Sequence, residues 1–85
     1  MSEFFEAIWN GQGIGDGADL EEVLQAYLVV KPEDGDWIKA CAVHDAAPPH
    51  VERFASFDDY LDNADPLERI PVSAQMISDA LALLP

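Results

Sequence analysis

Residues 26–43, AYLVVKPEDGDWIKACAV, are the stretch on which the interpretation of this chain depends. Two apolar runs flank a loop of turn residues at positions 32–35. β-Branched and aromatic side chains favour strands, while proline presets a turn φ and glycine supplies a positive φ. The pattern therefore predicts a β-hairpin in which Lys31 lies opposite Asp36.

The segment before this stretch fits two patterns. Phe4, Phe5, Ile8 and Trp9 recur at helical spacing behind Ser2, which predicts a short helix over residues 2–9 that stops at Asn10-Gly11. Phe5, Ala7 and Trp9 also alternate, so a short strand that leads into an Asn-Gly turn stays open as an alternative. Residues 11–17 hold four of the five glycines without the spacing of a phosphate-binding loop, and we expect a flexible connection there.

The next segment begins with a helix signal. Asp19 has the pattern of a capping residue with Glu22 three positions later, and the apolar residues from Leu20 to Leu28 follow helical spacing. Because the hairpin needs residues 27–30 as a strand, we expect the helix to stop near Gln25. The alternative is a strand that begins as early as Glu21.

Clearer signals follow in the second half of the chain. Residues 51–54 predict a third strand, and Ser56 predicts the start of a helix that Pro66 ends. Ser73 opens a last helix with one apolar stripe, formed by Met76, Ile77, Ala80, Leu81 and Leu84. Together these segments predict a small single α+β domain over residues 1–85, with a central antiparallel β-hairpin or three-stranded sheet covered by two to four short helices.

Residues with recognised chemistry are few. Cys41, His44 and His50 are the soft metal ligands, but residues three apart on one strand point to opposite faces, which disfavours both a zinc site and a Cys41–His44 nucleophile pair. The acidic run 58–68 lacks the spacing of a calcium loop. We therefore expect no metal, no cofactor and no catalytic activity. The start of the chain lacks a signal-peptide pattern, and no apolar run approaches the ~20 residues of a membrane span, so we expect a cytoplasmic protein.

Charge is the strongest functional signal of the sequence. Seventeen acidic residues face four basic ones, which gives a formal net charge of −13. Such a chain would be repelled by nucleic acid and by anionic lipid. A domain of this length is expected to be roughly 30 Å across, a length over which duplex DNA carries about 18 phosphates. The charge density of the protein is thus similar to that of DNA.

The acidic residues fall into sets. If residues 57–65 are helical, Asp58, Asp62 and Asp65 lie along one face without a compensating base, and a second set lies at the hairpin tip. A third set, Asp16, Asp19, Glu21 and Glu22, lies at the entry to the first helix. The predicted partner-binding residues are Asp58, Asp59, Asp62, Asp65, Glu68, Glu33, Asp34 and Asp36.

This distribution predicts a decoy that presents carboxylates where a basic nucleic-acid-binding protein expects phosphates. The expected partner is a CRISPR effector, a restriction enzyme or a nuclease, bound by a monomer or homodimer in a bacterial host cell. In size, acidity and low cysteine content the chain resembles, at the level of class, the anti-CRISPR and antirestriction inhibitors that phages and mobile elements encode. The alternatives are a nuclease immunity or antitoxin-type inhibitor, and a structural or scaffold subunit that pairs through the hairpin edge and uses acidity only for solubility.

Overall fold

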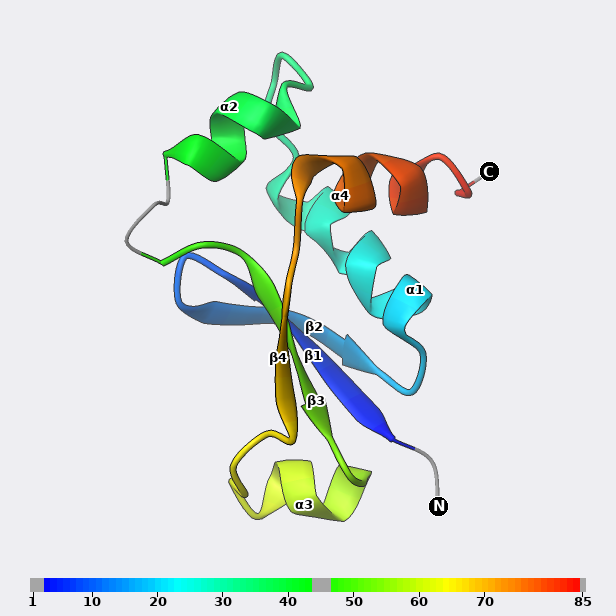
Figure 1. Ribbon diagram of the computed structural model, residues 1–85. Helices are drawn as coiled ribbons and strands as arrows, with labels where there is room; N and C mark the ends of the chain where they lie inside the picture. The colour runs from blue at the N-terminus through cyan, green and yellow to red at the C-terminus, as the bar shows by residue number, and fades with distance from the viewer. Residues whose placement is uncertain (1–2, 44–46, 85) are drawn as a thin grey trace.

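The predicted α+β class is confirmed by a computed structural model that describes residues 3–43 and 47–84. Four strands form one antiparallel sheet in the order β2-β1-β3-β4, as Figure 1 shows. The strands are β1 (Phe4–Trp9), β2 (Gln12–Gly17), β3 (His50–Phe54) and β4 (Glu68–Pro71). The helices are α1 (Leu20–Leu24), the 3₁₀ helix η1 (Gln25–Val30), α2 (Trp37–Ala42), α3 (Phe57–Leu61) and α4 (Ala74–Leu81).

The hairpin lies at the start of the chain, where β1 and β2 pair around Asn10-Gly11. Both turn residues have a positive φ, 53° at Asn10 and 79° at Gly11, as the common two-residue hairpin turn requires. The helix predicted over residues 2–9 is therefore wrong, and the strand alternative is correct. Alternation buries Phe5 and Ala7 on the helix-covered face of the sheet.

The glycine-rich segment is a strand and not the flexible connection that we expected. β2 pairs with β1 along its length, with a bulge opposite Ala7 and Ile8. Its glycines permit close packing: a Cβ on Gly15 would lie 2.4 Å from the Cβ of Ala26 in η1. Glycine at this position lets a helix lie directly on the edge of the sheet.

The two apolar runs of residues 26–43 lie in helices, η1 and α2, joined by a loop, so the hairpin predicted there is wrong. The helical spacing that begins at Leu20 continues through Val23, Leu24 and Tyr27, and all but Leu20 are buried. Asp36 then caps α2, because its carboxylate accepts a hydrogen bond from the Lys39 N–H at 3.1 Å. Burial of this apolar stripe outweighs the β-propensity of Val29 and Val30. The predicted helix end near Gln25 is the point at which the α-helix becomes 3₁₀.

Tyr27 joins this helical segment to the centre of the sheet. Its side chain is fully buried, and its hydroxyl donates to the carbonyls of Ile8 at 2.8 Å and His50 at 3.2 Å. Ile8 and His50 are partners across β1 and β3, so one side chain anchors the helix layer to both inner strands. Burial raises the pKa of the Tyr27 hydroxyl far above its ordinary value, with a smaller contribution from Cys41.

In the second half of the chain the predicted strand and the two predicted helix starts are confirmed, whereas β4 was not predicted as a strand. β3 is the third strand, Ser56 caps α3 and Ser73 caps α4, each through its side-chain oxygen. Ile77 and Ala80 of α4 are buried against the core. α3 lies beyond the end of the sheet, opposite the end near α2 (Figure 1). None of the helices within the described residues is long and apolar enough to cross a membrane.

Candidate functional site

The predicted acidic row lies on α3 and the turn that follows it. Tyr60 packs this helix onto the sheet face opposite the main core, with its ring centroid 4.8 Å from that of Phe4 and 5.4 Å from that of Phe54. The Ser56 hydroxyl accepts a hydrogen bond from the Asp59 N–H at 3.2 Å. These contacts fix a helix of only five residues whose isolated stability would be negligible.

The helix ends earlier than the expected row requires. The Asn63 N–H bonds to the Tyr60 carbonyl and the Ala64 N–H bonds to the Asp59 carbonyl, at 3.2 and 3.0 Å. With Asn63 at a φ of 58°, this is the Schellman arrangement that closes a helix. A continuous helical row through Asp65 is therefore wrong, although Asp65 stays in the same short segment.

Three carboxylates of this segment are free. Asp58, Asp62 and Asp65 are exposed, and none of the residues that the structure describes hydrogen-bonds or forms an ion pair with their side chains. Asp59 is partly buried, which removes it from the most accessible part of the set. The segment from residue 54 to residue 68 contains no lysine or arginine of its own, so its charged side chains are all acidic.

Glu68 differs from the other members of the row. Its carboxylate accepts from the Arg53 Nε at 3.1 Å across β3 and β4, and Arg53 also bonds to Glu3. We expected that no basic residue would pair with the acidic row, and for Glu68 this expectation is wrong. The hydrogen bonds to Glu3 and then to Glu68 raise the pKa of the Arg53 guanidinium.

The second predicted set lies at the other end of the molecule. Glu33, Asp34 and Asp36 belong to the loop between η1 and α2, far from α3 in Figure 1. Two of them have local structural contacts: Asp36 caps α2, and the Asp34 carboxylate accepts from the Asp36 N–H at 3.0 Å. The structure therefore does not bring the two predicted sets into one surface.

A second acidic group, which was not predicted from the sequence, lies on the strands beside α3. In the strand register, Glu6 of β1 lies opposite Asp16 of β2 and opposite Glu52 of β3. Three carboxylates therefore lie in neighbouring strands. The Tyr60 hydroxyl donates to Glu6 at 3.0 Å and to Asp16 at 3.4 Å. The hydrogen bond to Glu6, followed by burial, raises the pKa of Tyr60 to about 12. Only a correct placement of the β1–β2 hairpin could have revealed this group.

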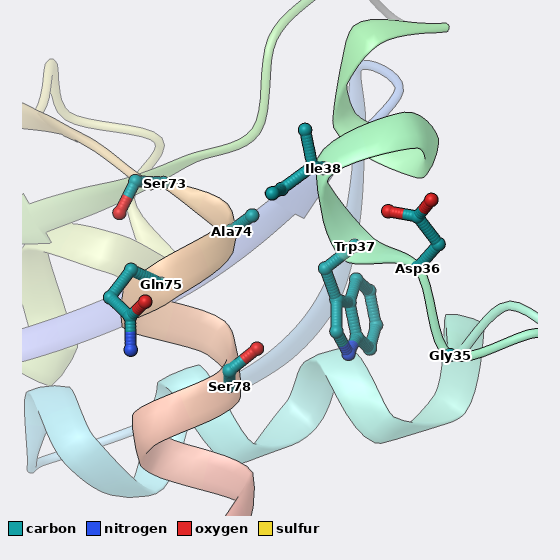
Figure 2. A pocket seen from close by; sticks show the side chains of 8 residues that line it. All are labelled: Gly35, Asp36, Trp37, Ile38, Ser73, Ala74, Gln75 and Ser78. Atoms are coloured by element: carbon teal, nitrogen blue, oxygen red, sulfur yellow. The ribbon is translucent and has the colours of Figure 1, made fainter.

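An open cleft of about 380 Å³ separates α2 from α4. Figure 2 shows Ile38 extending toward Ala74 across this cleft, while Asp36 points away from it. The lining residues are Gly35, Asp36, Trp37, Ile38, Ser73, Ala74, Gln75 and Ser78. They include two serines but neither a histidine nor a lysine that would activate a hydroxyl nucleophile.

Of the three soft ligands, Cys41 and His50 lie within the residues that the structure describes. Cys41 lies on α2 and not on a strand. The argument against a Cys41–His44 pair assumed a strand and therefore does not apply. His44 lies outside the described residues. The His50 ring is within 3.3 Å of the Pro48 carbonyl. No group of three or more potential ligands within the described part of the chain could hold a metal ion.

Comparison with known proteins returned neither a matching family model, nor a matching curated protein, nor a matching solved structure.

Proposed function

We propose that this protein is a non-enzymatic inhibitor that mimics nucleic-acid phosphates on a basic nucleic-acid-binding protein. The observation that carries this proposal is the group of unpaired carboxylates on the α3 segment: Asp58, Asp62 and Asp65 are exposed, and no base lies within the segment. A cationic channel would pair with such a group through charge-assisted hydrogen bonds.

The dimensions of the molecule support this proposal quantitatively. The molecule extends over 38 × 32 × 16 Å and has a formal net charge of −13. Duplex DNA of the same 38 Å length carries about 22 phosphates, so the protein reaches roughly 60% of the linear charge density of DNA. This is lower than the length-based expectation, because the molecule is longer than 30 Å, but it is sufficient to steer the protein toward a cationic surface.

The structure changes the ranking of the predicted contact residues. Glu68 already pairs with Arg53, and Asp34 and Asp36 stabilise their own loop, so these three have fewer free acceptor positions for a partner. The carboxylates of Asp58, Asp62 and Asp65 are exposed and keep all their acceptor positions for a partner. We therefore assign the main contact to α3 and its following turn, and only a steering role to the loop carboxylates.

The proposed targets are a CRISPR effector, a restriction enzyme or a nuclease in the cytoplasm of a bacterial host, as in anti-CRISPR and antirestriction inhibition. A nuclease immunity protein would use the same surface on a different target. The argument for a scaffold subunit relied on the edge of a hairpin at residues 26–43, and that segment instead forms η1, a loop and α2.

Affinity capture from bacterial lysate with mass spectrometry tests the proposal. Wild-type protein should retain a nucleic-acid-binding protein, and the triple variant Asp58→Lys, Asp62→Lys, Asp65→Lys should lose it. The double variant Glu33→Lys, Asp34→Lys is the control, with two charges reversed at the other end of the molecule where the triple variant reverses three, and it should retain most binding. Equal capture by all three proteins would contradict the proposal.

A further inference from the structure

The α3 segment exposes large apolar side chains beside its carboxylates. Phe57, Leu61 and Leu67 have 52%, 58% and 58% of their surface exposed. Phe57 and Leu61 are four residues apart and so lie on the same side of the helix. Leu67 lies where the chain returns to the sheet, and its N–H donates to the Arg53 carbonyl at 2.7 Å. Single exposed apolar residues are ordinary, but three within eleven residues at one end of the molecule form a candidate contact surface.

The opposite side of α3 is already occupied, which leaves this side available. Tyr60 faces the sheet and contacts Phe4 and Phe54 through its ring and Glu6 through its hydroxyl. Phe57 is anchored at one edge, with its ring 5.0 Å from that of Phe4 in an edge-to-face arrangement. The exposed side is thus presented by a helix whose position is fixed, which lowers the entropic cost of binding.

We infer that the exposed side of α3 docks into an apolar groove beside the cationic site of its partner. We call this the α3 surface and define it by Phe57, Leu61 and Leu67 together with Asp58, Asp62 and Asp65. The inference rests on the proposed function and extends it: carboxylates alone would make the protein a mimic of phosphate, whereas the apolar residues require a protein partner with both basic and apolar side chains.

Charge identifies this occupant among the alternatives. The carboxylates of the α3 surface have no base within residues 54–68, so a complementary surface must supply lysine or arginine. A second copy of the chain would place like charges opposite one another. Nucleic acid and anionic lipid would be repelled for the same reason. A basic protein remains, and its groove would cover the three apolar side chains.

The two components of the surface should contribute differently to binding. The carboxylates raise the association rate, and their attraction to a basic partner weakens as salt screens the charges. The buried apolar side chains slow dissociation and are largely insensitive to salt. Burial of one leucine side chain changes an equilibrium constant by roughly ten- to a hundredfold.

Two synthetic peptides of equal charge serve as probes. One is an amphipathic helix of lysine and leucine, and the other retains every lysine but has serine in place of each leucine. Titration of the wild-type protein, followed by amide chemical shifts, should show binding of the lysine–leucine peptide on the order of tenfold tighter or more, with shifts concentrated in residues 57–67. The double variant Leu61→Ser, Leu67→Ser should lose this difference, and each single variant should lose part of it. Ile38→Ser, at a position on α2 that is 77% exposed, is the matched control and should keep it.

The outcomes separate the docking inference from the proposed function. Equal affinity for the two peptides, with shifts at Asp58, Asp62 and Asp65, would overturn the apolar docking and leave phosphate mimicry standing. Shifts concentrated at residues 31–36 would overturn both. Self-association of the protein without peptide, lost in the double leucine variant, would show that a second copy covers the surface and would also overturn the inference.

Discussion

Gly15 of β2 and Ala26 of η1 pack so closely that a Cβ on Gly15 would lie 2.4 Å from the Cβ of Ala26. No real pair of Cβ atoms approaches this distance, and Ala26 has no flexible side chain that could move away. The contact joins the glycine-rich edge of the sheet to the helical layer. It therefore sets how closely the 3₁₀ helix lies on the sheet and where Tyr27, the next residue, enters the core.

Gly15→Ala should destabilise the protein, since the helix or the strand must shift to admit the methyl group. Overpacking of this kind costs about 1–3 kcal/mol, measurable as a lower midpoint in urea unfolding. Gly17→Ala is the matched control on the same strand, because its Cβ would meet Val23 at an ordinary 3.4 Å. If Gly15→Ala is as stable as Gly17→Ala, the close approach of β2 and η1 does not exist.

Tyr27→Phe should lower stability by about 1–2 kcal/mol, because the Ile8 and His50 carbonyls would lose a buried donor. Thermal or chemical unfolding measures this loss. Tyr60→Phe is the comparison: its hydroxyl bonds are part-buried or exposed at the side chains of Glu6 and Asp16, which water can solvate instead. If Tyr60→Phe were less stable than Tyr27→Phe, the Tyr60 hydroxyl, and not that of Tyr27, would contribute more to stability, which contradicts this account.

Alkaline pH should destabilise the folded protein through both tyrosines. Their ordinary pKa is 10.0, and the folded-state pKa is about 12 for Tyr60 and raised further for Tyr27. A raised folded pKa means that the unfolded chain loses its proton first. Stability is therefore full below about pH 10 and falls as pH rises toward 12. Denaturant midpoints across this range check the sign, and Tyr60→Phe should flatten part of the slope. Stability that rises over this range in the wild type would contradict these shifts.

Ile77→Ala should cost about 2–5 kcal/mol, because Ile77 is fully buried in the core. Trp37→Ala should be of similar severity, since its indole is buried and packs edge-to-face on Trp9 with centroids 6.0 Å apart. Asp62→Ala, at an exposed position, should change the melting temperature little. A strongly destabilised Asp62→Ala beside an unaffected Ile77→Ala would show that the buried and exposed faces are reversed.

The sequence predicted the second half of the chain well because its signals are local. Ser56 and Ser73 cap the helices that they were expected to cap, and β3 agrees with the expected strand to within one residue. The α3 helix was expected to be longer, because the left-handed conformation of Asn63 was not recognised as a stop. The carboxylates of α3 could therefore be found from sequence, but not the exact geometry of their row.

The first half was mistaken because two local patterns competed there. Val29 and Val30 suggest a strand, and the spacing from Leu20 to Tyr27 suggests a helix; burial of Tyr27 against Ile8 and His50 decides for the helix. The Asn10-Gly11 turn signal was visible, but the glycines after it were interpreted as flexible. The role of Gly15 depends on its contact with Ala26, which lies in a later element of the chain. For the same reason the carboxylates of Glu6 and Asp16 beside Tyr60 were not foreseen.

Competition with nucleic acid is the most direct test of phosphate mimicry by this protein. The nucleic-acid-binding protein captured from lysate is purified and loaded with a fluorescent duplex, and the acidic protein is then titrated in at about 50 mM and about 200 mM salt. We predict that duplex and inhibitor exclude each other, and that the higher salt weakens the inhibitor steeply. The Asp58→Lys, Asp62→Lys, Asp65→Lys variant should not displace the duplex at either salt concentration. A ternary complex in which duplex and inhibitor bind together without mutual weakening would contradict phosphate mimicry.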